Sequence, residues 1–349
     1  MIKLSQFGNS VRDKDLEKFK QSDNWDGDKF INLSKTTMDI NLSTIPKLLK
    51  QNFTNRKERR PKEPIEVNSF DSEKFLSAEK GPKFIWYGHS VLMIHINGVK
   101  ILIDPMFGSD AAPISPIGSK RFSDNTLSII DSLPNFDAIL ITHDHYDHLD
   151  LDSIKKLKNK CSKWFVALGV SRHLEQWGVA SSEITEFDWW DNINFEGIKI
   201  TFTPSRHFSG RGLFDRAKSL WGGWVLKTDD HSIYWSGDGG YDNHFEEVGQ
   251  KLGPFDIGFM ECGQYNTHWH QIHMFPEEAV KAAIVSQTKL AIPVHWGAFA
   301  LALHSWTDPV ERFTREATHK GLSFYIPSPG EIFNKERNKQ PNNWWKEIE

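Results

Sequence analysis

The sequence predicts layered α and β structure built around sheets. Two observations favour this class: an early hairpin, and a later alternation of short apolar runs with helical segments. The hairpin lies within VLMIHINGVKILIDP, where Asn97 and Gly98 form a two-residue turn between apolar stretches. The chain of 349 residues is 38% hydrophobic and 13% aromatic, which is enough to bury a large core.

Three regions are expected along the chain. Residues 1–80 are polar and poorly periodic, and they predict an N-terminal arm, partly extended and packing on the core. The compact domain should span residues 81–335, with a tail at 336–349. The basic run at residues 56–60 could contact acidic phospholipid, but a solvated loop is favoured because no apolar face accompanies it.

The expected elements follow in order. The strands are FIWYG, the two arms of the hairpin, DAILIT, KWFVALGV, IKITFTP, LWGGWVLKT paired with HSIYWSGD, FDIGFMEC and finally AIPVHWG. Asp150 and Asp152 can cap a helix after DAILIT, and FEEVGQKLG forms a second helix. Pro276 opens a third at its favoured first position, with Glu277 and Glu278 in the first turn.

The heptapeptide THDHYDH follows the buried strand DAILIT and carries three histidines and two acids. If the backbone stays extended, His143 and His145 point to the same side, and Asp147 and His148 follow where the chain turns. Imidazole and carboxylate together suit zinc, iron or manganese. One pair of residues can serve one metal, and the other pair a second.

Three further candidates follow apolar strands: His207, Asp238 and His295. The residues then complete two sets. The first set is His143, His145, His207 and Asp238; the second is Asp147, His148, Asp238 and His295, with Asp238 bridging. Two metals about 3.5–4 Å apart activate a shared water and stabilise an oxyanion. Such a site hydrolyses phosphodiesters, lactones, thioesters or amides, and the ligands alone do not choose among these.

The H-x-H-x-D-H motif with its later His, Asp and His resembles the metallo-β-lactamase-fold hydrolases from about Phe84 to about Phe313. That resemblance implies a four-layer αβ/βα sandwich with the metals at one edge of two facing sheets.

Further blocks resemble the N-acylphosphatidylethanolamine-hydrolysing phospholipase D family. They are FDWWDN, SRHFSGRGLFDRAKSLWGGWVL, YWSGDGGYDNHFEEVGQKLGPFD, QIHMFPEEAV and HWGAFALALHSWTDP. This similarity implies two zinc ions, a metal-bridging hydroxide and cleavage of a lipid phosphodiester that releases an N-acylethanolamine.

Additional site residues gain roles from this resemblance. Asp147 and His273 are expected to be catalytic, His273 by donating a hydrogen bond or a proton to the leaving alkoxide. Weaker candidates for supporting a ligand or contacting substrate are His89, Asp104, Arg211 and His304. For Asp104 the alternative is a turn residue before a proline, for Arg211 a structural ion pair, and for His273 a surface position.

Some residues depart from the phospholipase-like pattern. Glu261 replaces an apolar residue and could reshape the pocket or pair with a nearby cation. Cys262 is expected to be a small buried side chain rather than a nucleophile. His268 and His270 add a third possible metal site, although a mobile loop over the pocket is favoured.

The composition of the chain limits the cellular locations and the classes of binding partner that we expect. The net charge of −4 gives no basic footprint for nucleic acid, so a nuclease is disfavoured. The chain has only two cysteines, and it shows neither a signal-like N-terminus nor an apolar span of roughly 18 residues. We therefore expect a cytoplasmic protein, possibly peripheral to the membrane. We expect a phosphodiester or lipid-like substrate and leave open a homo-oligomer. The alternatives are a lactonase of the ascorbate-lactone-opening type, a nuclease and a non-catalytic metal sensor.

Overall fold

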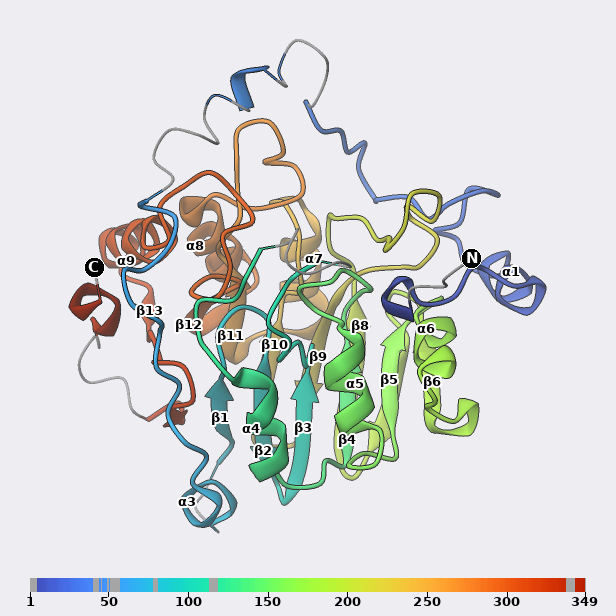
Figure 1. Ribbon diagram of the computed structural model, residues 1–349, viewed down its shortest axis with the longest axis horizontal. Helices are drawn as coiled ribbons and strands as arrows, with labels where there is room; N and C mark the ends of the chain where they lie inside the picture. Colours follow the sequence, from blue (N-terminus) through green and yellow to red (C-terminus); the bar gives the residue numbers. More distant parts are fainter. Residues whose placement is uncertain are drawn as a thin grey trace.

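The computed structural model describes residues 5–39, 44, 46–48, 50, 57–77, 81–112, 119–336 and 343–348. Within this part of the chain, two seven-stranded sheets face each other, and helices cover their outer faces (Figure 1). The predicted α/β sandwich is therefore confirmed.

The first sheet contains the early hairpin, and its strand order is β14-β1-β2-β3-β4-β5-β6. Its bounds are β1 Lys83–Trp86, β2 Leu92–Ile96, β3 Val99–Ile103, β4 Ala138–Ile141, β5 Trp164–Ala167, β6 Ile184–Phe187 and β14 Ile332–Phe333. Asn97 and Gly98 both have positive φ, as the two-residue turn requires. Strands β3 to β6 run parallel, so their carboxyl ends meet at one edge.

The second sheet has the order β13-β12-β11-β10-β9-β8-β7. Its bounds are β7 Asn192–Phe195, β8 Ile198–Thr203, β9 Gly223–Lys227, β10 Ser232–Trp235, β11 Phe255–Glu261, β12 Thr288–Val294 and β13 Ser323–Phe324. Strands β10, β11, β12 and β13 are parallel neighbours. Their carboxyl ends therefore also share an edge.

The helices include three that the sequence predicts: α5 Leu151–Leu157, α7 His244–Leu252 and α8 Pro276–Val285. The Asp150 side chain caps α5 by accepting from the backbone N–H groups of Asp152 and Ser153. Further helices in the described part of the chain are α1 Asp13–Phe19, α3 Ser72–Leu76, α4 Thr126–Ser132, α6 Ser171–Gln176 and α9 Asp308–Lys320, with short 3₁₀ turns at Ser5–Phe7, Ser181–Glu183 and Trp344–Glu347.

One expectation about the fold is wrong, and another holds in part. The segment AIPVHWG forms the end of β12 but is not the last strand, because the two-residue strands β13 and β14 follow it. The basic run at 56–60 agrees with a solvated loop at most of its described positions, because Lys57, Glu58 and Arg60 are exposed residues of a turn and bend. Arg59 is the exception, because it is buried. Arg60 donates to the Lys120 carbonyl and lies 5.6 Å from the Phe122 ring centroid. Arg56 lies outside the described residues.

Aromatic residues anchor both ends of the chain on the core. In the arm, Phe19 and Phe30 are buried and pack with Trp25 at centroid distances of 5.0–5.1 Å. Near the C-terminus, Trp344 stacks on Trp296, which follows β12. Asn32 of the arm also donates to the His207 carbonyl at 2.8 Å and accepts from the His207 N–H at 3.0 Å, so the arm reaches the edge of the sheets where the metal-ligand candidates lie.

Candidate metal centre

The seven ligand candidates follow four strands whose carboxyl ends reach the same edge. THDHYDH follows β4, His207 follows β8, Asp238 follows β10 and His295 follows β12. All seven side chains are shielded from solvent except that of His145, which is partly buried. The topology thus brings together residues up to 152 positions apart, from His143 to His295.

Three imidazoles form the first group. Nδ1 of His145 lies 3.0 Å from Nε2 of His143 and 3.1 Å from Nε2 of His207. Nitrogens bound tetrahedrally to one ion at 2.0–2.1 Å would be separated by about 3.3 Å. The two separations are close to this, and all three atoms lie within 4.8 Å of one another, so the three rings could share one metal ion.

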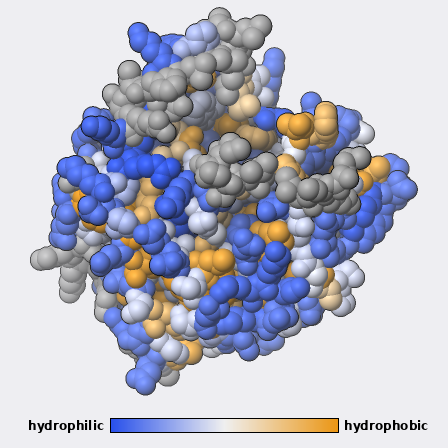
Figure 2. All heavy atoms as spheres, viewed as in Figure 1, coloured by the Kyte–Doolittle hydropathy of each residue, from blue (hydrophilic) through white to orange (hydrophobic). Residues whose placement is uncertain are grey.

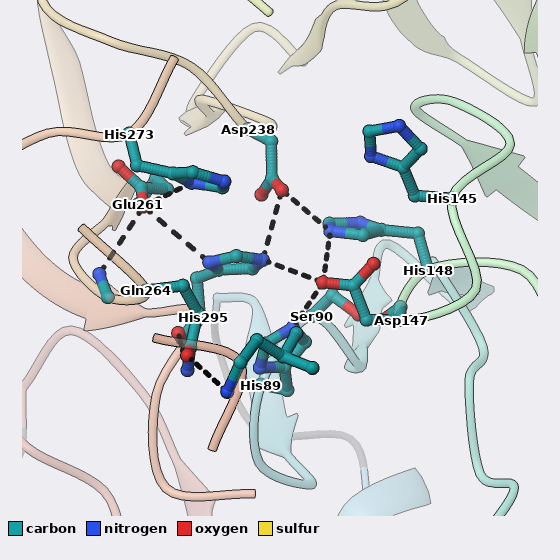
Figure 3. A network of polar contacts seen from close by, with 12 residues as sticks. His89, Ser90, His145, Asp147, His148, Asp238, Glu261, Gln264, His273 and His295 are labelled. Carbon is teal, nitrogen blue, oxygen red and sulfur yellow. Dashed lines mark hydrogen bonds and ion pairs between the residues drawn. The ribbon is translucent and has the colours of Figure 1, made fainter. Parts of the chain in front are cut away.

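The second group combines Asp147, His148 and His295. Oδ2 of Asp147 lies 3.2 Å from Nε2 of His295 and 3.8 Å from Nε2 of His148. Figure 3 shows these three side chains converging on the same space from separate segments. The two halves of THDHYDH thus belong to different groups.

Asp238 joins the two groups through one oxygen. Its Oδ2 lies 3.1 Å from Nε2 of His148 and 3.0 Å from Nε2 of His295. The same oxygen lies 4.0 Å from Nε2 of His143 and 3.8 Å from Nε2 of His207. A carboxylate in this position can bridge two ions.

The polar atoms of these residues fit a cation. Nε2 of His148 is buried and, among the described residues, has no hydrogen-bond partner, although it faces Asp238. Burial disfavours a charge on His148, but Asp238, Asp147 and Asp104 outweigh this and raise its pKa to about 10. A site that attracts a proton so strongly also attracts a metal cation, which competes with that proton.

Groups behind the ligands fix their orientation. Asp104 lies after β3 and is fully buried; its Oδ2 lies 2.9 Å from Nδ1 of His148. Thr142 donates to the same carboxylate from its backbone N–H at 2.8 Å and from its hydroxyl at 2.7 Å. Nδ1 of His207 lies 2.9 Å from the Ile272 carbonyl. Such partners leave the other ring nitrogen for a metal.

His89 supports Asp147 in a similar way. Its Nε2 lies 2.8 Å from Oδ2 of Asp147, and its ring packs 4.0 Å from that of His295. Burial and the nearby His295 lower the pKa of His89 to about 3, so the ring is neutral and donates this hydrogen bond. The structure thus places both His89 and Asp104 against proposed ligands.

A cavity of about 240 Å³ opens onto the metal groups. It is lined by Met38, His145, Asp147, His207, Phe208, Asp238, Gln264, Trp269, Ile272, His273, His295 and Leu301. His273 has its ring 5.0 Å from that of His207. The sequence-predicted histidine therefore reaches the space where a substrate would meet the metals.

Two weaker candidates lie elsewhere. Arg211 is buried and gives its guanidinium hydrogens to the carbonyls of Gln6, Asp144 and Leu149. These contacts hold the arm against the metal loop and do not support a role in binding phosphate. His304 stacks on Tyr265 at 4.3 Å, its Nδ1 faces the Ser305 carbonyl, and it belongs to none of the possible metal-binding groups among the described residues.

Other residues of the motif blocks have structural contacts. His268 faces Asp39 and His270 faces the Thr267 carbonyl, and neither belongs to a metal-competent group within the described part of the chain. Cys262 is buried and burial raises its pKa, which agrees with a non-nucleophilic role.

Asp144 was not singled out from the sequence. It sits inside THDHYDH but turns away from the metals, accepting from the Gly210 N–H at 2.7 Å and from the Ser219 hydroxyl. The sequence signal for this orientation is the position of Asp144 between His143 and His145. On an extended backbone, neighbouring side chains point to opposite sides, so Asp144 points away when the two histidines face a metal.

A beta-lactamase superfamily domain matches residues 99–296, which is more than half of the chain and contains all seven ligand candidates. The chain belongs to the metallo-β-lactamase superfamily. As a member of this superfamily it is a metal-dependent hydrolase, and its His and Asp cluster is able to hold metal ions.

Relatives of this superfamily member cover nearly its whole length. An uncharacterised protein of Mycobacterium tuberculosis is 33% identical over 94% of this chain and 88% of its own. The N-acyl-phosphatidylethanolamine-hydrolyzing phospholipase D 1 of Caenorhabditis elegans is 32% identical over 94% of this chain and 95% of its own.

Solved structures share the superfamily fold. A metallo hydrolase from the archaeon Ignicoccus hospitalis has a TM-score of 0.56 at 21% identity, covering 72% of this chain and 97% of the other. The isothiocyanate hydrolase from Delia radicum gut bacteria has a TM-score of 0.55 at 18% identity, covering 72% and 98%. At these identities the likeness concerns the fold alone.

Proposed function

We propose that this protein is a dinuclear metal-dependent phosphodiesterase of phospholipase D type, acting on N-acylphosphatidylethanolamine-like lipids. The observation that carries the proposal is the position of Asp238 Oδ2, within 3.0–4.0 Å of four imidazole nitrogens from two ligand groups. The choice of substrate is supported by the full-length similarity to the C. elegans phospholipase.

Two zinc ions are the proposed cofactors, with iron or manganese as alternatives because the set contains no thiolate. His143, His145, His207 and Asp238 would hold one ion, and Asp147, His148, His295 and Asp238 the other. When bound, such a pair supplies an activated water and neutralises charge on a phosphate.

His273 is the proposed proton donor. In the overall reaction, water adds to phosphorus, and the bond from phosphorus to the leaving oxygen breaks. The imidazolium of His273 gives its Nε2 hydrogen to the leaving alkoxide. The attacking water loses one proton, and uptake of a proton by His273 then completes the cycle. His273 lines the cavity, so its outer nitrogen can exchange protons with solvent.

A groove of about 510 Å³ adjoins the cavity and shares Met38, His207, Phe208 and Ile272 with it. Its other wall is the arm, from Lys29 to Thr37. This groove offers space for the apolar part of a lipid, with Lys35 and Arg216 among its lining residues as partners for an anionic headgroup.

Peripheral contact with a lipid surface is part of the proposal. Leu213 and Phe214, in the loop between β8 and β9, are 90% and 94% exposed. Figure 2 shows an apolar patch at the upper right of the view, on the side where Figure 1 draws the loop between β8 and β9. The described helices include none long and apolar enough to cross a bilayer. Replacing both residues by serine should reduce sedimentation with anionic vesicles while leaving cleavage of a soluble diester unchanged.

A substrate panel tests the proposed reaction. The purified protein, with its metal content measured, is given an N-acylphosphatidylethanolamine, bis(p-nitrophenyl) phosphate and an acyl lactone. We expect cleavage of both diesters and loss of both activities after chelation. Turnover of the lactone without diester cleavage would instead support the lactonase alternative.

A further inference from the structure

Glu261 is a buried acid that the two metal groups do not use. It is the last residue of β11 and is only 1% exposed. It pairs with Val294 on the neighbouring strand β12, directly before His295. We propose that Glu261 is a positioning residue whose Oε1 holds Nδ1–H of both His273 and His295, so that Nε2 of each ring faces the reaction. The catalytic part of this inference rests on the proposed function.

The contacts of Glu261 come from both histidines and the backbone near them. Oε1 lies at hydrogen-bonding distance, 3.2 Å, from Nδ1 of His273. Nδ1 of His295 faces the same oxygen in a longer contact of 3.5 Å and has no hydrogen-bond partner among the described residues. Oε2 accepts from the Met274 N–H at 2.9 Å, and Oε1 also accepts from the Gly263 N–H at 3.3 Å. The carboxylate is thus fixed from several sides and cannot turn without losing these bonds.

This arrangement selects one orientation for each ring. A carboxylate only accepts hydrogen bonds, so Nδ1 of His273 must carry hydrogen. The same negative charge 3.5 Å from Nδ1 of His295 favours hydrogen on that atom as well. For His295 the remaining atom, Nε2, is then free to bind a metal and lies 3.0 Å from Asp238 Oδ2. Figure 3 shows both rings extending from Glu261 toward Asp238.

The same logic applies to His273. When its ring is protonated, the second hydrogen is at Nε2, on the side of the cavity, and can pass to a leaving alkoxide. After transfer, the first hydrogen stays on Nδ1 against Glu261, so the ring does not need to turn before it is protonated again. An acid behind a histidine keeps its ring oriented in this way in other proton-transfer sites.

Charge balance explains why an acid is tolerated here. Glu261 accepts from the N–H groups of Gly263 and Met274 and faces Nδ1 of His273. Cations in the adjacent ligand groups would add further positive charge, whereas an isolated buried carboxylate would be strongly unfavourable.

The test compares leaving groups in the Glu261→Gln variant. N-acylphosphatidylethanolamine releases an alkoxide that needs a proton, whereas bis(p-nitrophenyl) phosphate releases a phenolate that does not. We expect kcat to fall roughly ten- to hundredfold on the lipid, with KM within about twofold. On the nitrophenyl diester the fall should be several times smaller.

Glu278→Gln is the matched control. It removes the same charge nearby, where Glu278 accepts from the Phe275 N–H, and glutamine also suits this capping position. Its rates on both diesters should match those of the unmodified protein.

A second readout does not depend on activity. Because the contact with Nδ1 of His295 loses its negative charge, Glu261→Gln should release one zinc equivalent to a chelator roughly tenfold more readily than Glu278→Gln does. His273→Ala should reproduce the leaving-group dependence, and adding Glu261→Gln to it should cause little further loss on the lipid.

Distinct outcomes separate the two proposals. If the unmodified protein cleaves neither diester, the proposed function fails, and the zinc measurement still tests the His295 contact. If it cleaves both but, with zinc saturating, Glu261→Gln lowers the two rates equally, or leaves both rates and zinc retention unchanged, the positioning role is overturned.

Discussion

Asp104 and His148 form a fully buried pair in which Oδ2 lies 2.9 Å from Nδ1. The contact joins the end of β3 to the metal loop after β4, two parallel neighbours in the sheet. Because the carboxylate occupies Nδ1, Nε2 is the only ring nitrogen that can meet a metal. Because β3 lies beside β4, Asp104 can hold the His148 ring with its Nε2 atom directed toward the metal group.

We predict that Asp104→Asn weakens metal binding at the group containing His148 by roughly ten- to hundredfold, because an amide is a poorer partner for Nδ1–H than a carboxylate. Equilibrium dialysis of zinc against a chelator measures this. Asp137→Asn is the control, because Asp137 lies at the opposite end of β4 and bonds to Lys100. Equal zinc affinity in the two variants would contradict the orienting role of Asp104.

Asp238→Asn should abolish hydrolysis while leaving the protein folded. An amide cannot bridge two cations as a carboxylate does, so the two groups would no longer share an oxygen. Circular dichroism checks the fold, and diester cleavage checks the activity. Asp242→Asn, four residues later and beside Arg206 at 3.7 Å, should retain activity. Near-normal turnover by Asp238→Asn would refute the two-metal arrangement.

Acidification should remove the two metals in order. Burial disfavours charge on His295, but Asp238 and Asp147 raise its pKa well above the usual value, and the pKa of His148 is also raised. Burial and neighbouring histidines instead lower the pKa of His143 and His207. In the metal-free protein the first two rings hold protons at neutral pH, so a metal there must displace them.

Metal affinity at the group containing His148 and His295 therefore rises with pH. As the pH drops, this group should lose its metal before the group containing His143 and His207 does. Metal retained after dialysis at a series of pH values between about 8 and 5 measures this. We expect one equivalent to leave at a higher pH than the other. Simultaneous loss of both would show that the groups do not differ in this way.

Phe30→Ala should destabilise the protein by about 3–5 kcal/mol, because it removes a buried ring from the contact with Phe19 and Trp25. Urea unfolding measures the change in the free energy of unfolding. Leu33→Ala in the same arm is the control, since Leu33 is 56% exposed and its loss should change stability by less than about 0.5 kcal/mol. A similar small effect for Phe30 would mean that the arm is not anchored by this cluster.

Strong local patterns explain how much of the fold was predictable. The Asn97-Gly98 hairpin and the Asp150 cap follow from a few adjacent residues, and both are present. The short strands β13 and β14 were missed because two residues cannot show an alternating pattern; their pairing depends on β12 and β1, which are distant in sequence.

The residues of the site also fall into a part that the sequence predicts and a part that it does not. His207, Asp238 and His295 could be found because each follows an apolar strand, and parallel topology brings such ends together. The roles of Asp144 and Arg211 could not, because they depend on contacts with Gly210, Ser219 and the N-terminal arm. The contact between Glu261 and two histidines likewise depends on how β11 and β12 pair.

The most direct test of the central claim is the rate of N-acylphosphatidylethanolamine cleavage as zinc is added to metal-free protein. The account predicts that activity rises to a plateau at two equivalents of zinc per chain. A plateau at one equivalent or below, or no diester cleavage at any zinc content, would contradict a dinuclear phosphodiesterase bridged by Asp238.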